Sequence, residues 1–485
     1  MHTNSNTYLE NKKMILVLGG TTEGRIAVQT LEEAGKPFYY STKGYEQDIP
    51  LHNGIRLQGG MDKDAMESFC RKENISLLID AAHPFAEELH RNVNDVSDKL
   101  QIPAILYDRI YPRIEKHDGI VWCDSFEDAV QKIKKEEVYI LLALTGVKSI
   151  GKLKALWQES CRCYFRILDR ESSRELARSE AFPEEYLRYY HAGEDERLLI
   201  RQIRPDAIII KESGASGGFS EKVEAAQELG IRIFIIKRPP LQPNLLPVNG
   251  RHGLRRMVEL YHPGFYDLRS GFTTGTCAAA AAAAAIWDIF NLDGTPRPPE
   301  FIVTLPNGEM IGVPVEPQKQ RPRSSSVNDN WMVESEACVI KDAGDDPDIT
   351  NGMQIKVNIA LPFNMDEVNS GKQQDDYNII IAGGEGIGIV TMPGLGLELG
   401  APAINPTPRK MIEENVRMYL SYVGVPKMSS PIVVTISVPG GEEIAKRTFN
   451  PRLGIEGGLS IIGTSGIVKP FSSEAFVSSI RKSME

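Results

Sequence analysis

Along the first part of the chain, short apolar runs alternate with segments in which apolar residues recur at helical spacing. The runs predict strands, and the amphipathic segments predict helices. Because strands joined through helices pair in parallel, this alternation predicts a parallel sheet covered by helices on both faces. The predicted strands are residues 14–20, 37–42, 75–82 and 102–108, and the predicted helices are residues 21–35, 62–74 and 84–100.

A second series of the same kind follows residue 113. The fold class expected for the N-terminal half is therefore α/β, with two doubly wound lobes that each hold a parallel sheet. Such sheets bind ligands at the carboxyl ends of their strands, so we expect a cofactor and a substrate to meet in a cleft between the lobes. The predicted strands are residues 138–146, 161–168, 206–214 and 231–239, and the predicted helices are residues 126–137 and 220–230.

The stretch at residues 238–253 is rich in proline and interrupts the alternation of strands and helices. Such a change in composition marks a domain boundary. We expect a first domain at residues 14–255, a linker at residues 256–267 and a second domain at residues 268–485. The second domain is richer in glycine and β-branched residues. This composition predicts an α+β fold there.

Two local patterns stand out in the second domain. Residues 300–316 alternate apolar and polar positions around Asn307-Gly308, which predicts a β-hairpin. Residues 316–330 are polar, serine-rich and without periodicity, which predicts a surface loop.

The chain has 485 residues and a formal net charge of −10. This charge excludes nonspecific nucleic-acid binding, which needs a dense basic surface. No window approaches the ~20 uninterrupted apolar residues of a membrane span, and the first residues lack the apolar core of a signal peptide. We therefore expect a cytoplasmic protein that binds neither nucleic acid nor a membrane, and assembly into a homo-oligomer stays open.

The six cysteines are few and scattered, which fits a reducing compartment and predicts no disulfide framework. Cys161 and Cys163 lie two positions apart in a predicted strand, so both thiols should share one face. Since no second pair of cysteines or histidines lies nearby, a buried structural pair is favoured over zinc, and no metal site is predicted.

The turn between the first strand and the first helix reads GGTTEGR, residues 19–25. A phosphate there would meet backbone N–H groups and the positive end of the helix dipole. Gly19 and Gly24 match the outer positions of the G-x-G-x-x-G fingerprint, and Thr21 replaces its middle glycine. A threonine-capped turn without a ligand accounts for the loop equally well. No acidic ribose ligand stands at residues 40–43, so NADPH and NADH both stay open.

His83 follows a predicted strand, at the edge where α/β proteins bind ligands. Its place before a proline gives it an extended, exposed backbone, and an ordinary helix-start residue is the alternative interpretation. Five segments within residues 14–240 resemble, in order and spacing, the precorrin-6A reductase family: GGTTEGR, IDAAHPFA, LLALTGVK, IIIKESG and KRPP.

That family transfers a hydride from a reduced nicotinamide to the tetrapyrrole (cobalt-)precorrin-6A. The resemblance implies NADPH or NADH as cofactor, His83, Lys211 and Lys222 as catalytic residues, and residues 211–214 facing the cleft. The substrate carries several carboxylates around a large apolar ring, so its site needs cationic donors and an apolar slot. The implied cofactor-binding residues are Gly19, Gly20, Thr21, Thr22, Gly24 and Arg25.

In the second domain, residues 269–277 lead into eight alanines, Ala278–Ala285. They predict a helix with a threonine cap, for which tight packing is favoured and anion binding is the alternative. Cys277 at the helix start has no paired base, so we do not expect a catalytic thiol.

The acidic residues 342–348 lack calcium-loop spacing and predict turns or caps. The glycines at 383–388 predict close backbone approach, either to a nucleotide-like ligand or within a hairpin.

Four segments are similar to the cobalt-precorrin-5B C(1)-methyltransferase family: SGFTTGTCAAAA, DAGDDPDITNG, GGEGIGIVTMPGLGLELGAPAINPTPRKMI and GGLSIIGTSGIVKPFS. That family uses S-adenosyl-L-methionine to methylate carbon 1 of the ring, giving cobalt-precorrin-6A. Its members continue past the last segment with a His-Gly-Lys-Leu-type motif that this chain lacks, so we expect a truncated methyltransferase half. The resemblance implies a cofactor cradle at Gly383, Gly384, Gly386 and Gly388, and substrate contacts at Thr273, Thr274, Asp345 and Asp346.

Together the two resemblances predict a bifunctional enzyme that makes cobalt-precorrin-6A and then reduces it. The alternative is a reductase whose C-terminal half is a non-catalytic corrinoid-binding or docking module. A short-chain dehydrogenase or sugar epimerase is disfavoured, because the Tyr-x-x-x-Lys pair of that class is absent around residues 186–190.

Overall fold

The computed structural model describes residues 13–44, 49–111, 118–191, 193–291, 295–318, 322–327, 330–363, 376–394, 396–425, 427 and 430–470. Contacts divide the chain into an N-terminal unit, Met1–Gln29 with Pro37–Pro247, and a C-terminal unit, Thr30–Lys36 with Val248–Glu485. The domain limits expected from the sequence stay a prediction. No helix within the described ranges combines the length and apolar character that crossing a membrane requires.

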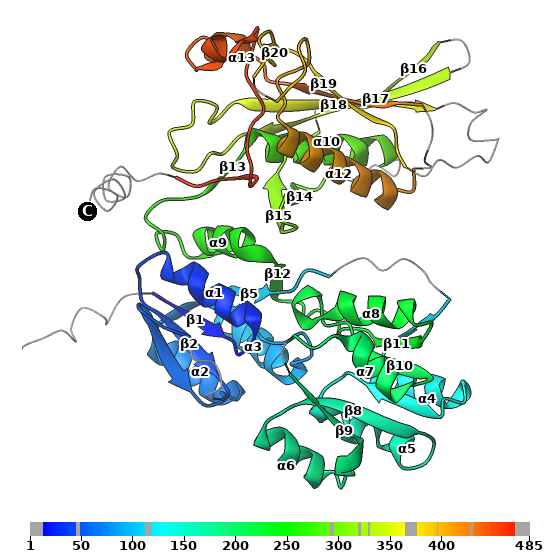
Figure 1. Cartoon of the computed structure of the whole chain (residues 1–485). Coiled ribbons are helices and arrows are strands. Elements are labelled where there is room, and N and C mark those ends of the chain that lie inside the picture. The colour runs from blue at the N-terminus through cyan, green and yellow to red at the C-terminus, as the bar shows by residue number, and fades with distance from the viewer. Residues whose placement is uncertain are drawn as a thin grey trace, which may run out of the picture. The chain divides into compact units, whose positions relative to one another are not determined.

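The first lobe of the N-terminal unit is built on a six-stranded sheet in the order β12-β5-β4-β1-β2-β3 (Figure 1). The pairs from β3 through β2, β1 and β4 to β5 are parallel. All five residues of β1 are buried, as expected for a sheet covered on both faces. On one face, Leu16 and Leu18 share a core with Met66 and Val93 from two helices. The elements are β1 (Met14–Leu18), α1 (Thr22–Glu32), β2 (Phe38–Thr42), β3 (Gly54–Gln58), α2 (Lys63–Lys72), β4 (Ile75–Asp80), α3 (Glu87–Leu100), β5 (Ala104–Tyr107) and β12 (Leu245–Val248).

The second lobe is a parallel six-stranded sheet in the order β6-β11-β10-β7-β8-β9. Alternate residues of β10 enter opposite cores, with Ile209 in one and Ile208 and Ile210 in the other, so helices cover both faces. The predicted α/β class with two parallel sheets is confirmed. The elements are β6 (Ile120–Cys123), α4 (Phe126–Lys135), β7 (Ile140–Ala143), α5 (Lys154–Trp157), β8 (Arg162–Leu168), α6 (Glu171–Ser179), β9 (Leu187–Tyr190), α7 (Glu196–Ile203), β10 (Ala207–Lys211), α8 (Phe219–Glu228) and β11 (Arg232–Ile236).

The C-terminal unit is α+β, as predicted. Its five-stranded sheet has the order β16-β17-β18-β21-β19, antiparallel except for the parallel pair β19–β21. The alanine-rich helix α10 is buried along its length against this sheet and α12. The principal elements are α9 (Gly250–Tyr261), β13 (Gly271–Phe272), α10 (Thr274–Phe290), β14 (Glu300–Thr304), β15 (Met310–Pro314), β16 (Arg323–Val327), β17 (Asn330–Ile340), β18 (Gln354–Phe363), β19 (Ile379–Gly383), β20 (Ile389–Val390), α12 (Pro406–Tyr422), β21 (Ile432–Ser437), α13 (Gly441–Ala445), β22 (Ile455–Glu456) and β23 (Ile467–Val468).

Two local predictions in this unit had different outcomes. The hairpin is confirmed: β14 and β15 pair antiparallel around Gly308, which has φ +83°. The prediction of a surface loop at residues 316–330 is wrong in part, because Arg323–Val327 form β16 and pair with β17. Cross-strand pairing to a long neighbour stabilises a polar strand that no local periodicity indicates.

Candidate functional site

The turn from β1 into α1 is shaped by three glycines. A Cβ on Gly19 would lie 2.5 Å from Cε2 of Tyr40, and a Cβ on Gly24 would lie 3.0 Å from Cα of Gly19. These two positions therefore need glycine for close packing of strand, turn and helix. Gly20 has φ +118°, and a Cβ there would meet no atom within 4 Å, so its backbone is open to a ligand. The turn fits a nucleotide phosphate at the N-terminus of a helix.

The turn lies beside the end of β4, because β1 and β4 are neighbours in the sheet. The Thr21 hydroxyl donates to the carbonyl oxygen of Ala81 at 2.9 Å, and the Ala81 N–H donates to the carbonyl oxygen of Leu18 at 2.8 Å. The strand order reverses here, since β2 and β3 continue on one side of β1 and β4 and β5 on the other. Open α/β sheets bind their ligands at such a switch point.

A buried charge pair holds the loop after β4. The Asp80 carboxylate is fully buried; it accepts the Ala82 N–H at 3.1 Å and contacts Nδ1 of His90 at 2.6 Å. The other ring nitrogen of His90 donates to the carbonyl oxygen of His83 at 3.0 Å. Burial alone would lower the pKa of His90, but these partners outweigh it and raise the pKa. Both ring nitrogens thus act as donors of an imidazolium that clamps the loop carrying His83.

His83 itself is neutral at physiological pH. Burial, together with the positive charges of Arg109 and Lys211, lowers its pKa to about 4. Nδ1 accepts the backbone N–H of Phe85 at 3.2 Å, which leaves the ring proton on Nε2. His83 therefore presents a hydrogen-bond donor and no charge.

Arg109 connects the two lobes of the N-terminal unit. Its guanidinium contacts the Glu23 carboxylate at 2.9 Å and donates to the carbonyl oxygen of Ser213 at 2.7 Å. The hydroxyl of Ser216 also hydrogen-bonds Glu23. Burial raises the pKa of Glu23, but the Ser216 hydrogen bond and the Arg109 charge outweigh it and hold the pKa below its usual range. The nucleotide-type turn of the first lobe is thereby tied to the loop after β10 in the second.

The two predicted lysines lie at the same junction. Lys211, at the end of β10, places its ammonium 5.2 Å from the ring centre of Phe85 in the first lobe. Burial, with Lys152 and Lys148 nearby, lowers its pKa to about 8. The Lys222 ammonium donates to the carbonyl oxygen of Gly217 at 2.7 Å, and burial lowers its pKa too.

A pocket of about 470 Å³ opens beside the His83 loop. Leucines and prolines make up most of its apolar wall, and Arg91 and Arg238 supply cationic groups. The Arg238 guanidinium stacks 3.8 Å from the ring centre of Tyr111 and contacts the Asp108 carboxylate at 2.9 Å, which fixes its position. The lining residues are Ala82, Pro84, Glu87, His90, Arg91, Leu106, Tyr107, Asp108, Tyr111, Arg238, Pro239, Pro240, Leu241, Gln242, Leu245 and Pro247.

The structure brings most of the predicted N-terminal residues together. Gly19, Gly20, Thr21 and Gly24 form one turn, whereas Thr22 and Arg25 lie exposed on the first turn of α1. His83, Lys211 and Lys222 lie around Arg109, whose charge acts on His83 and Lys222. The roles assigned to these residues stay predictions. Sequence reasoning missed four buried charged residues, although the first two stand inside the quoted motifs: Glu23, Asp80, His90 and Arg109.

In the C-terminal unit, the start of α10 is enclosed by protein. Thr273 caps the helix by accepting the N–H of Thr276 at 3.3 Å. The Thr276 hydroxyl donates to the carbonyl oxygen of Gly466 at 2.6 Å, so the GTSG segment covers the helix start. Thr273 and Thr274 are buried, and Cys277 is fully buried, which raises its pKa to about 12. The tight helix packing favoured from the sequence is confirmed.

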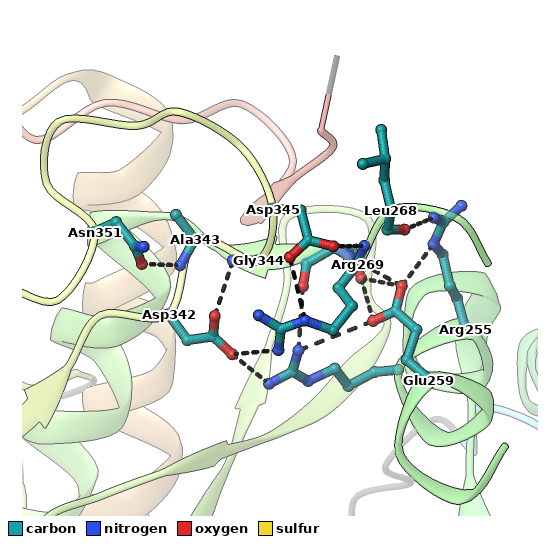
Figure 2. Close-up of polar contacts among 11 residues, drawn as sticks. Arg255, Glu259, Leu268, Arg269, Asp342, Ala343, Gly344, Asp345 and Asn351 are labelled. Carbon is teal, nitrogen blue, oxygen red and sulfur yellow. Dashed lines mark hydrogen bonds and ion pairs between the residues drawn. The ribbon is translucent and has the colours of Figure 1, made fainter. Parts of the chain in front are cut away.

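Side chains among the acidic residues 342–348 also contact other groups of the protein. Figure 2 shows Asp342 and Asp345 beside the segment at Arg269. Asp345 accepts the backbone N–H of Arg269 at 2.7 Å, and Asp342 pairs with Arg256 at 2.8 Å. Asp346 is half-buried. Substrate contacts at Asp345 and Asp346 stay a prediction.

The glycines at the end of β19 and directly after it are packed against other atoms of the protein. Cβ atoms on Gly384, Gly386 and Gly388 would lie 2.2 Å from Ser437 Oγ, 2.0 Å from the Val438 carbonyl oxygen and 2.4 Å from Ile455 Cγ2, and one on Gly383 would lie 2.8 Å from Pro402 Cβ. Close approach within the protein accounts for all four glycines. The cofactor cradle at these glycines stays a prediction from the family resemblance alone.

The fold and the N-terminal site define a doubly wound α/β domain of the nucleotide-binding type, with a pocket that contains two arginines beside the loop after β4. The chain belongs to the precorrin-6x reductase CbiJ/CobK family, whose model matches residues 14–259, more than half of the chain. Residues 262–470 match the CbiD family model. These matches assign the protein to cobalamin biosynthesis.

Parts of the chain are similar to individual known proteins. The chain is 43% identical over 218 residues to the cobalt-precorrin-5B C(1)-methyltransferase of Prosthecochloris aestuarii, covering 45% of this chain and 52% of that protein. It is 46% identical over 213 residues to the enzyme of the same name from Moorella thermoacetica, covering 44% and 49%. The chain thus spans about half the length of these curated relatives. A solved structure named CobK precorrin-6A reductase aligns with 52% of this chain and 98% of its own, at 21% identity and a TM-score of 0.43.

Proposed function

We propose that the chain is a bifunctional enzyme of corrin-ring construction. Its N-terminal unit reduces (cobalt-)precorrin-6A with NADPH or NADH, and its C-terminal unit methylates cobalt-precorrin-5B at carbon 1 with S-adenosyl-L-methionine. The two reactions are consecutive, because the product of the methylation is the substrate of the reduction. The observation that carries the reductase assignment is a nucleotide-type turn and a cation-lined apolar pocket at one sheet edge, in a chain of the reductase family.

The pocket suits one edge of a ring-shaped, carboxylated substrate. Its volume of about 470 Å³ lies in the range of roughly 300–1,000 Å³ typical of small-ligand sites. Arg91 and Arg238 suit the carboxylates of the ring edge, and the leucines and prolines suit its apolar surface. Ala82 and Pro84, which flank His83 in the chain, line the pocket, so the ring would lie next to the loop that faces the nucleotide turn.

Reducing a double bond needs a hydride and a proton. When bound, the nicotinamide supplies the hydride. Lys211 is better suited than His83 to supply the proton, because a group with a pKa of about 8 is largely protonated at neutral pH and one with a pKa of about 4 is not. His83 contributes a hydrogen bond from Nε2, and Arg109 holds the two loops in register.

Replacing Lys211 by methionine or by arginine tests this assignment. Wild-type kcat/KM should fall as the pH rises through about 8, because Lys211 loses its proton there. Both variants should lose this alkaline limb, and Lys211→Arg should retain KM for the tetrapyrrole because it keeps the positive charge. An unchanged pH profile in Lys211→Met would reject Lys211 as the proton donor.

The pocket assignment is tested separately. Arg91→Met and Arg238→Met should each raise KM for the tetrapyrrole about tenfold or more, as expected for a lost charge-assisted hydrogen bond of ~1.5–3 kcal/mol. KM for the nicotinamide should stay unchanged. Arg197→Met removes an arginine that pairs with Glu228 away from the pocket and serves as the control. A rise in KM for the nicotinamide alone would assign the arginines to the cofactor.

The methyltransferase proposal rests on the family match of residues 262–470. Protein atoms occupy the space where a Cβ would stand on each of the four glycines at 383–388, so we derive no step through S-adenosyl-L-methionine. Calorimetry of the full chain with this cofactor tests the proposal. Saturable binding supports a methyltransferase, whereas the absence of binding, with the reductase intact, supports the docking-module alternative.

A further inference from the structure

Cys161 and Cys163 hold their thiols side by side at the start of β8. Their Sγ atoms are 3.4 Å apart, which confirms that both thiols share a face. Two backbone hydrogen bonds anchor the chain here: the Cys161 N–H donates to the carbonyl oxygen of Leu156 at 2.9 Å, and the N–H of Arg162, between the two cysteines, donates to that of Tyr139 at 2.8 Å. Cys163 continues in parallel register with Leu141 of β7. The two sulfur atoms are therefore held together by the sheet.

The two thiols differ in access to solvent. Cys163 is 2% exposed, whereas Cys161 is half-buried and lines a shallow surface depression of about 450 Å³ with Trp157 and Glu159. The hydrogen bond from Cys163 lowers the pKa of Cys161 and raises that of Cys163. A reagent in solution can therefore reach the Cys161 thiol directly. It modifies the buried Cys163 thiol by way of Cys161.

We propose that Cys161 and Cys163 form a thiol–disulfide exchange site that reacts with low-molecular-weight disulfides. The Cys161 thiolate attacks one sulfur of the reagent and breaks its S–S bond, giving a mixed disulfide and one free thiol. Cys163 then loses its proton and attacks Cys161 Sγ, which releases the second thiol and closes an internal disulfide. The protein dithiol is oxidised by two electrons, and the reagent is reduced to two thiols.

The geometry favours a reversible disulfide. Residues two apart in a strand place their Cα atoms roughly 6.5 Å apart, near the upper end of the range of ~4.4–6.8 Å that disulfides span. A strained disulfide is more easily reduced than a structural one. Metal binding is disfavoured, because the described residues contain no group of three or more His, Cys, Asp or Glu side chains that could hold an ion.

The test uses the full chain treated with oxidised glutathione, followed by intact-mass measurement and peptide mapping. Wild type should lose the mass of two hydrogens, retain no glutathione and show the disulfide within one peptide. Cys163→Ala should trap one glutathione on Cys161, and Cys161→Ala should stay unmodified. Reduced glutathione should reverse the wild-type product. The described structure buries the four other cysteines, so they serve as internal controls.

Several outcomes would overturn the proposal. Wild type that retains glutathione as stably as Cys163→Ala would show that Cys163 does not resolve the mixed disulfide. A Cys161→Ala variant that reacts as fast as wild type would show that Cys161 is not the entry point. Wild type that stays unmodified would show that the pair is only structural. This result is measured on the wild-type protein, so it does not depend on whether a variant folds.

Discussion

Replacing Arg109 with methionine removes the cationic partner of the buried Glu23 carboxylate while keeping an unbranched side chain of similar length. The two side chains are each 6% exposed and lie 2.9 Å apart. Breaking a buried ion pair by removing one partner costs ~3–5 kcal/mol, because the remaining charge loses its compensation. Glu23 keeps the Ser216 hydroxyl, so we expect a cost near the lower limit, about 3 kcal/mol.

A matched control is available on the surface of the same unit. Arg197 pairs with Glu228 at 2.6 Å, but their side chains are 33% and 56% exposed. Exposed pairs contribute ~0–1 kcal/mol, so Arg197→Met should cost less than about 1 kcal/mol. The double variant Glu23→Gln with Arg109→Met should cost less than the sum of its single variants, since neither partner is left charged and alone.

The assay must resolve the two units, because a single unfolding midpoint is not defined for a chain of two units. Hydrogen exchange followed by peptide mass spectrometry at increasing urea gives the opening free energy of each segment. Arg109→Met should lower it for peptides of the N-terminal unit and leave the C-terminal unit unchanged. If Arg109→Met costs no more than Arg197→Met, the reasoning that the buried pair holds the two loops is refuted.

Three further predictions concern stability and reactivity. His83 has a folded pKa of about 4 against an unfolded value near 6.5, so its contribution to stability is full above pH 6.5 and falls by roughly 3 kcal/mol as the pH drops to 4. If the opening free energy of the N-terminal unit, measured by hydrogen exchange, varies equally with pH in wild type and His83→Gln, this prediction is contradicted. Gly386 and Gly400 both have positive φ, but of these two only Gly386 would bring an added Cβ against backbone. Gly386→Ala should therefore destabilise the C-terminal unit by about 2 kcal/mol more than Gly400→Ala. If hydrogen exchange shows the same loss of opening free energy in both variants, the predicted clash at Gly386 is refuted. Cys277, with a pKa of about 12, should resist iodoacetamide in the native chain and react in urea, and native labelling of this residue by peptide mapping would contradict its burial.

Sequence patterns predicted those helices, strands and turns that interactions between residues close in the sequence stabilise. The apolar run of β1 followed by glycines defines the first strand and turn, and the alternation around Asn307-Gly308 defines the hairpin. In contrast, β16 is polar and forms because β17 pairs with it, so its stabilising partner lies outside its own sequence window. β9 is short, with an exposed end at Tyr190, and gave no clear periodic signal.

The candidate site shows the same division. The glycine turn and His83 could be found because turn chemistry and proline geometry act over a few residues. Arg109 could not, because its partner Glu23 is 86 positions away and only the folded sheet brings them together. The glycines at 383–388 indicated close backbone approach, but the sequence left open whether they approach a ligand or other parts of the protein.

The central claim is hydride transfer to the tetrapyrrole ring by the N-terminal unit. Its most direct test incubates the full chain with cobalt-precorrin-6A and each of the two nicotinamide cofactors, deuterated at the transferable position. The account predicts a product that gains one deuterium from the cofactor and one proton from solvent, with one equivalent of cofactor oxidised. An unreduced ring with both cofactors, or a reduced ring without deuterium, would contradict it.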